Sequence, residues 1–182
     1  MKLHIKISGL IVVLALTFIA CDSNASLQKY YVDSKENSEF ISIDLPSSIL
    51  QLKETEVSDD IKNTLETIKK VNFLALQLND TNKDLYTSEK LKVTTILKNP
   101  KYKQLMRMNF GKSNVSVNYL GEEDAIDEVV IFGADNDKGF AVIRVLGENM
   151  NPSEIMKLAN EIKLDGESGQ MQQLEGLLSG LK

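Results

Sequence analysis

The stretch "IDEVVIFGADNDKGFAVIRVL", Ile126–Leu146, contains the pattern that decides the fold of this chain. Two apolar runs flank "DNDKG", Asp135–Gly139, and a tight hairpin turn requires residues of these types. Its aspartates could instead hold a metal ion, but the turn is favoured. Each run is apolar on both alternating faces, which predicts two antiparallel strands buried on both sides. In the first strand Val129 and Ile131 point to one face, and Val130 and Phe132 point to the other. In the second strand one face has Phe140, Val142 and Leu146, and the other has Ala141, Ile143 and Val145.

Two more strands precede this hairpin, and no helical pattern separates the four. The turn residues Gly111 and Gly121 mark two further chain reversals. A meander of neighbouring strands is the natural arrangement of such a run. The four strands are expected at Tyr102–Phe110, Asn114–Leu120, Ile126–Ala134 and Gly139–Leu146.

Two strands and two helices are expected upstream of the meander. Pro46 closes a first strand over Phe40–Leu45, because proline cannot donate to a ladder. "VNFLALQL", Val71–Leu78, predicts a buried strand, with a continuation of the preceding helix as the alternative. The first helix is expected from Ser58, Asp59 and Asp60 through a stripe of Val57, Ile61, Leu65 and Ile68 to Lys69 and Lys70. The second is expected from Ser88 through Leu91, Val93, Ile96 and Leu97 to Asn99, where Pro100 stops it.

A third helix follows the meander. Asn151 can cap it, Pro152 suits its first position and Glu154 is the reciprocal capping acid. Its apolar stripe comprises Ile155, Leu158, Ala159 and Ile162. The order β-α-β-α-β-β-β-β-α predicts an α+β fold, an antiparallel sheet with helices packed mainly on one face. We expect it to form a single domain over residues 39–166.

Residues 167–182 are expected to form an amphipathic tail after this domain. Three helices are too few to cover both faces of the sheet, so the tail is a candidate cover. Gly176 and Gly180 would each cost such a helix about 1 kcal/mol, and a frayed tail without specific contacts is the alternative. The apolar residues of the tail recur at helical spacing and are Met171, Leu174, Leu177, Leu178 and Leu181.

Residues 1–20 have the layout of a secretory signal peptide. Lys2 and Lys6 precede the uncharged apolar run Ile7–Ala20. A membrane-spanning anchor is the alternative, but a helix of this length reaches roughly 21 Å, short of the roughly 30 Å hydrocarbon core. A signal that is removed is therefore favoured.

The apolar run ends at Cys21, the only cysteine of the chain. "FIAC", Phe18–Cys21, resembles the bacterial lipobox, in which a small residue precedes a cysteine that is diacylated before the signal is cleaved. The resemblance implies cleavage after Ala20 and a permanent lipid anchor on Cys21. An ordinary signal cut near Ala20 or Ala25 is the alternative, although it would leave an unpaired thiol in an oxidising compartment. The polar stretch over residues 21–38 is then expected to act as a tether between lipid and domain.

Removal of the signal changes the chemistry available to the mature chain. The only histidine, His4, leaves with it, and 19 basic residues remain against 26 acidic ones, a net charge of −7. Without histidine or a free thiol, Ser-His-Asp and Cys-His nucleophile systems and imidazole-bearing metal sites are excluded. The acidic balance disfavours nucleic acid and anionic lipid headgroups as partners. We therefore expect no catalytic residues, no metal and no cofactor.

Two acidic clusters need separate consideration. Asp80, Asn82 and Asp84 occupy the first, third and fifth positions of a calcium loop, but leucines replace its glycine and its bidentate glutamate, which favours a plain polar turn. Glu122, Glu123 and Asp124 could supply paired carboxylates for a glycosidase. Two such catalytic groups must lie about 5 to 10 Å apart across a cleft, so three adjacent acids more simply form a solvated loop.

Two segments resemble one protein family. "GFAVIRVLGENMNPSEIMKLANEI", Gly139–Ile162, is similar to the closing strand and capped helix of the bacterial lipoprotein family catalogued as domain of unknown function 4252. "QKYYVDSKENSEFISIDLPSSIL", Gln28–Leu50, is similar to its opening segment. The resemblance implies a small envelope lipoprotein of a Gram-negative bacterium, and it supplies no activity or catalytic residues.

Together these observations predict a lipid-anchored cell-envelope protein. Lipid on Cys21 would hold it to the inner or the outer membrane, with the domain in the periplasm. We expect a non-catalytic module that binds another envelope component or takes part in signalling or envelope maintenance. A small carboxylate-dependent enzyme acting on envelope glycans is the alternative, and a structural module that oligomerises through its sheet is a third hypothesis.

Overall fold

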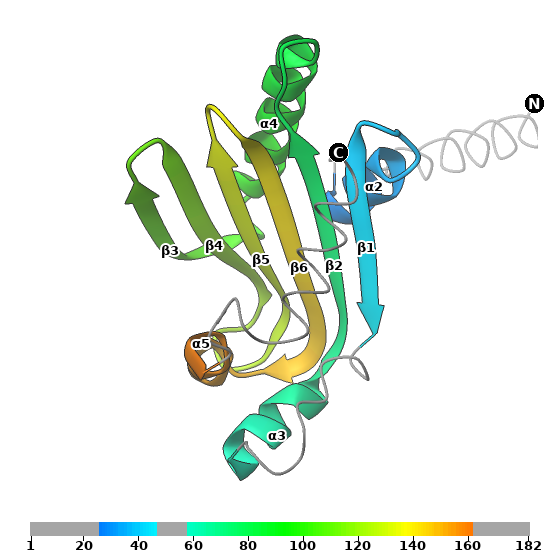
Figure 1. The fold of residues 1–182 in the computed structure, drawn as a ribbon. Helices are drawn as coiled ribbons and strands as arrows, with labels where there is room; N and C mark the ends of the chain where they lie inside the picture. Colours follow the sequence, from blue (N-terminus) through cyan, green and yellow to red (C-terminus); the bar gives the residue numbers. More distant parts are fainter. Residues whose placement is uncertain (1–25, 47–57, 162–182) are drawn as a thin grey trace, which may run out of the picture.

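A computed structural model of the chain describes residues 26–46 and 58–161 (Figure 1). Within these ranges the elements follow the predicted order β-α-β-α-β-β-β-β-α, with one further helix, α2, in front of it. The elements are α2 Leu27–Ser34, β1 Phe40–Pro46, α3 Asp59–Thr67, β2 Ile68–Gln77, α4 Lys83–Leu97, β3 Lys103–Phe110, β4 Ser113–Gly121, β5 Ile126–Asp135, β6 Gly139–Met150 and α5 Pro152–Glu161.

The six strands form one antiparallel sheet in the order β1-β2-β6-β5-β4-β3. This confirms the predicted α+β class and places β3 to β6 in a meander. The predicted hairpin turn is present, since the Asp135 carboxylate accepts hydrogen bonds from the backbone N–H groups of Asp137 and Lys138 at 2.8 and 3.1 Å. Gly139 closes the turn at φ +121°, where an added Cβ would lie 2.1 Å from the Leu76 carbonyl oxygen.

The helices divide between the two faces of the sheet. On one face α2 and α4 cover a buried cluster that includes Leu74, Val130 and Phe140. On the other face α3 and α5 pack against a smaller cluster around Val129, at one end of the strands (Figure 1). The sequence predicted helices mainly on one face of the sheet. The structure instead places α2 and α4 on one face and α3 and α5 on the other. Val129 and Val130 belong to different clusters, as their alternation predicts.

Several predicted boundaries are wrong, and the strand expected to end at Leu146 runs on to Met150. The helix expected from Ser88 begins at Lys83, because Asn82 takes the position that caps it, and the Ser88 hydroxyl donates to the Leu85 carbonyl inside the helix. The helix expected to end at Lys70 ends at Thr67. Lys70 instead pairs with Leu146 of β6, so β2 begins before Val71. This pairing excludes the alternative in which the helix continues through Val71–Leu78. The cap at Asn151 is confirmed, because its side chain accepts from the Ser153 and Glu154 N–H groups.

The tether expected over residues 21–38 is too long. Leu27–Ser34 form α2, and the side chains of Leu27, Tyr30 and Tyr31 are buried, so the folded domain includes this segment. The remaining sites predicted from sequence, Ala20, Cys21, Met171, Leu174, Leu177, Leu178 and Leu181, lie outside the described residues.

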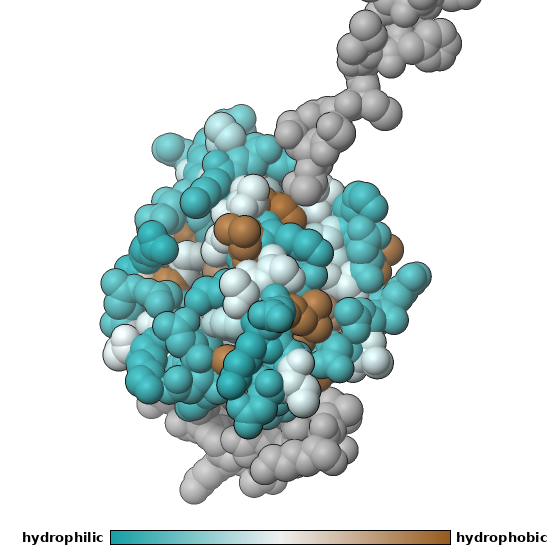
Figure 2. All heavy atoms as spheres, turned by 90° about the horizontal axis from the view of Figure 1, so that it is seen from above, coloured by the Kyte–Doolittle hydropathy of each residue, from teal (hydrophilic) through white to brown (hydrophobic). Residues whose placement is uncertain are grey.

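Seen from above, the described surface is mainly hydrophilic, and the hydrophobic patches in this view are small and separate (Figure 2). None of the helices in residues 26–46 and 58–161 is both long enough and apolar enough to cross a bilayer.

Candidate functional site

Helix α2 forms one wall of the candidate site. Its first turn is capped by Ser26, whose Oγ accepts a hydrogen bond from the Lys29 N–H at 3.1 Å. The buried residues are Leu27, Tyr30, Tyr31 and Ser34, a spacing that places them on one face of the helix. This spacing of the four buried residues is the sequence signal that predicts a helix here. The polar residues that stand between them obscure that signal.

A buried ion pair attaches α2 to the centre of the sheet. Arg144 of β6 is 2% exposed, and its Nε and Nη2 donate to the two carboxylate oxygens of Glu128 at 2.9 and 3.0 Å. Its Nη1 donates to Oε1 of Gln28 on α2 at 2.7 Å. One guanidinium group therefore joins β5, β6 and α2, which fixes the position of the helix.

A second polar cluster holds the other side of α2. The Tyr31 hydroxyl and the Asn72 amide both donate to Oδ1 of Asp44, the former at 2.8 Å. Partial burial raises the pKa of Asp44, but the hydrogen bonds from Tyr31 and Asn72 and the charges of Lys70 and Lys35 outweigh this, so the pKa lies below its usual value. Asp44 is therefore ionised when these contacts form.

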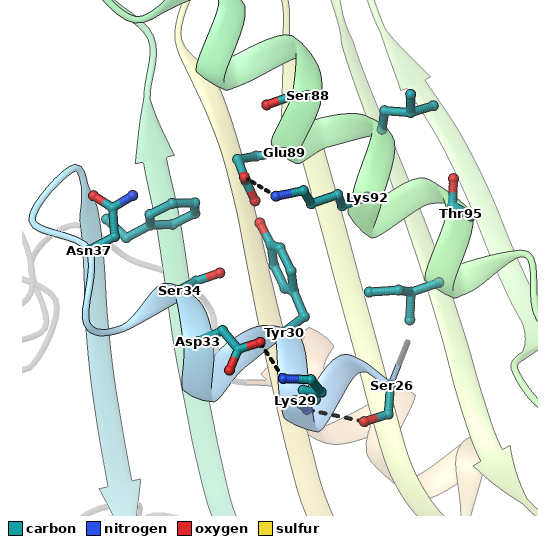
Figure 3. A pocket seen from close by; sticks show the side chains of 13 residues that line it. Ser26, Lys29, Tyr30, Asp33, Ser34, Asn37, Ser88, Glu89, Lys92 and Thr95 are labelled. Atoms are coloured by element: carbon teal, nitrogen blue, oxygen red, sulfur yellow. Dashed lines mark hydrogen bonds and ion pairs between the residues drawn. The ribbon is translucent and has the colours of Figure 1, made fainter. Parts of the chain in front are cut away.

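Helices α2 and α4 leave a groove of about 970 Å³ between them (Figure 3). Its floor is aromatic: the Tyr30 ring meets Phe40 edge-on at a centroid distance of 6.5 Å, and Phe40 meets Phe140 at 6.2 Å. Leu91, with 64% of its surface exposed, lies among the lining residues and leaves a large apolar side chain in contact with solvent. The lining residues are Ser26, Lys29, Tyr30, Asp33, Ser34, Asn37, Phe40, Ser88, Glu89, Leu91, Lys92, Thr95 and Ile96.

The Tyr30 hydroxyl is the unusual group of this groove. It is buried and makes no hydrogen bond of adequate geometry in the described part of the chain, although it points toward Glu89 (Figure 3), and Glu89 and Ser34 lie near enough to act on its pKa. Burial, followed by the negative charge of Glu89, raises the pKa of Tyr30, so the hydroxyl keeps its proton. A buried donor without an acceptor costs about 1 to 3 kcal/mol. An acceptor from a bound molecule would remove that cost.

Each wall of the groove carries one ion pair. On α4 the Glu89 carboxylate, with a side chain only 10% exposed, lies 2.7 Å from Nζ of Lys92. On α2 Lys29 lies 2.8 Å from Asp33, and both are exposed. An apolar floor with a few polar groups around it is typical of sites that bind small molecules or peptides. The groove is thus suited to a ligand with an apolar part and a hydrogen-bond acceptor.

The acidic clusters predicted from sequence lie elsewhere. Around Asn82, side-chain hydrogen bonds build a polar turn, and Asp80 pairs with Lys83 at 2.8 Å. Glu122, Glu123 and Asp124 are exposed in the turn between β4 and β5. No group of three or more Asp, Glu, His or Cys residues in the described ranges could hold a metal ion. Sequence reasoning missed Tyr30 and Glu89 as site residues, because only the packing of α2 against α4 brings them together.

Comparison with known proteins assigns the chain to a family. The family described as "Domain of unknown function (DUF4252)" matches residues 30–158, a span that runs from α2 to α5 and confirms the predicted resemblance. No curated protein and no solved structure matches the chain. Because the match covers more than half of the sequence, this chain belongs to the DUF4252 family.

Proposed function

We propose that this protein is a lipid-anchored, non-catalytic protein of the cell envelope that binds another envelope component in the groove between α2 and α4. The observation that carries the proposal is the buried Tyr30 hydroxyl, which makes no hydrogen bond of adequate geometry in a groove with an apolar floor and an ion pair on each wall. Such a group is costly in the free protein, and binding of an acceptor would offset that cost. The function is therefore recognition, with the groove as the site.

The position of α2 relates this groove to the anchor. Ser26, which lines the groove, is five residues after Cys21. Five residues span at most about 18 Å even when fully extended. A lipid on Cys21 would thus keep this end of the groove within about 18 Å of the lipid-bearing residue, and the ligand would be met next to the membrane surface.

The anchor is tested by Cys21→Ser, with Ser23→Ala as the matched control. We expect Cys21→Ser to abolish labelling with a palmitate analogue and to release the protein from the membrane fraction. Ser23→Ala should retain both properties. Labelled, membrane-bound Cys21→Ser protein would show that the anchor assignment is wrong.

The groove is tested by photo-crosslinking in cells of the source bacterium. A photoreactive residue at Leu91 should give a discrete crosslinked product that Tyr30→Phe weakens. Val32 is the matched control, because it is an exposed apolar residue on α2, 45% exposed, that does not line the groove. Equal products from Leu91 and Val32 would contradict the proposal. Glycan turnover by the purified protein that is lost in Glu89→Gln would favour the carboxylate-dependent enzyme instead.

A further inference from the structure

The sheet face opposite α2 and α4 carries apolar residues in rows that cross the strands. The pairing of β1, β2, β6, β5 and β4 aligns one side chain from each strand in every row. The first row is Ile41, Ala75, Ala141, Gly133 and Val115; the second is Ile43, Phe73, Ile143, Ile131 and Val117; the third is Leu45, Val71, Val145, Val129 and Tyr119. This face is apolar over five adjacent strands.

Described helices cover only one end of these rows. Leu65 of α3 and Ile155 of α5 pack with the cluster that contains Val129 of the third row. No member of the first row belongs to either buried cluster. The short side chains of that row leave a hollow of about 470 Å³, lined by residues that include Ile41, Phe73, Val115 and Gly133. Of the second row, Ile131 and Val117 belong to the covered cluster, whereas Ile43, Phe73 and Ile143 belong to neither cluster. The first row and these three residues therefore form an apolar surface that no helix in residues 26–46 and 58–161 covers.

We propose that this hollow binds residues 170–181 of the same chain as an amphipathic helix. The described chain ends at Glu161 in α5, a helix that packs at the covered end of the same face, and residues 162–182 follow. From the third row to the first is about 14 Å along the strands, and residues 162–169 can span roughly twice that distance. The segment can therefore reach the hollow.

The segment also matches the surface in length and pattern. A helix over 170–181 is about 18 Å long, and five adjacent strands are about 19 Å wide. Its leucines at 174, 177, 178 and 181, with Met171, would form one apolar side. Its polar side, which includes Gln172 and Ser179, would face water. This inference depends on neither the lipid anchor nor the groove.

Disulfide trapping in the purified mature chain tests the contact. Cys21→Ser removes the only cysteine, so that Ala141→Cys and Leu177→Cys can be added as a defined pair. Mild oxidation should give an intramolecular disulfide in a monomer. The matched control replaces Leu177→Cys by Ser179→Cys, on the polar side of the same helix, and should react several-fold more slowly. Equal rates for the two pairs, or disulfide-linked dimers alone, would overturn the proposal, the latter in favour of a second copy on this face.

Gly133→Leu provides an independent block of the hollow. An added Cβ at Gly133 would meet only the Cγ2 atom of Val115, at an ordinary 3.8 Å, so the sheet itself accommodates the change. We expect the far-ultraviolet circular dichroism to stay unchanged, the disulfide between positions 141 and 177 to form several-fold more slowly, and binding of an apolar dye to rise. An unchanged rate of disulfide formation in a folded Gly133→Leu protein would contradict the proposed site.

Discussion

Both faces of the sheet carry apolar residues on neighbouring strands, but the faces differ in how they are covered. On the α2–α4 face Phe140 lies at centroid distances of 6.0 to 6.2 Å from Phe40, Tyr86 and Phe132. Arg144, in the same strand as Phe140, is also buried. On the opposite face Phe73 is half-buried and belongs to neither cluster. Strand periodicity thus predicts which face of a strand is apolar. Which element covers that face depends on contacts between residues distant in sequence.

The largest expected difference between the faces concerns Arg144. Arg144→Met leaves the Glu128 carboxylate buried without its partner and removes the contact to Gln28. We expect a loss of about 3 to 5 kcal/mol in the free energy of urea unfolding. The control is Lys69→Met, which breaks an exposed pair with Glu148 and should cost less than about 1 kcal/mol. Similar losses in both variants would show that burial does not distinguish the two pairs.

Two phenylalanines on opposite faces sharpen the comparison further. Phe140→Ala removes the centre of the aromatic cluster and should lower the free energy of unfolding by about 3 to 5 kcal/mol. Phe73→Ala should cost about half as much, because Phe73 is only half-buried. Urea denaturation of both variants measures the difference. Equal losses would mean that the second face is as well packed as the first.

A smaller, pH-dependent effect is expected at Tyr31. Tyr31→Phe removes the hydrogen bond to Asp44 and should cost about 1 kcal/mol near neutral pH. The pKa of Asp44 is lowered by folding, so the stability contributed by this carboxylate is present above its unfolded pKa and lost as pH falls through the folded value. The difference between wild type and variant should therefore shrink in acid.

Tyr86→Phe serves as the control for that pH dependence. The Tyr86 hydroxyl donates to the backbone carbonyl of Asp135 at 3.0 Å, an acceptor that does not titrate. The stability that Tyr86→Phe loses should thus be similar at neutral and acidic pH. Parallel pH profiles for the Tyr31 and Tyr86 variants would contradict the role assigned to Asp44.

The smallest expected effect concerns Tyr30, the neighbour of Tyr31 in α2. Tyr30→Phe removes a hydroxyl that makes no hydrogen bond of adequate geometry in the described structure, so stability should be unchanged or rise by up to about 1 kcal/mol. Thermal unfolding measures this change. A loss comparable to that of Tyr31→Phe would mean that the hydroxyl is already satisfied in the free protein, which would contradict a ligand acceptor at this group.

Elements with local signals could be predicted from the sequence, and elements that depend on distant partners could not. The Asp135–Gly139 turn and the cap at Asn151 use bonds between residues two to four apart. Asn82 begins its helix without a local cap bond, because its side chain bonds to Gln77 and Glu39 outside the helix, and the sequence does not predict such contacts. The groove could not be predicted at all, since its walls, α2 and α4, are separated by two strands and a helix in the chain.

The bond between Gln28 and Arg144 also has a consequence for the order of folding. These residues are 116 positions apart, so the bond that fixes α2 to the centre of the sheet cannot form until β6 has been synthesised. Contacts of such sequence separation form late, because a long loop must close before they give any stability. During synthesis Gln28 therefore lacks this partner while β1 to β5 emerge, although α2 can already contact β1 through Tyr31 and Asp44. An enzyme that modifies Cys21 would have that interval to reach the cysteine before the neighbouring helix is fixed against the sheet.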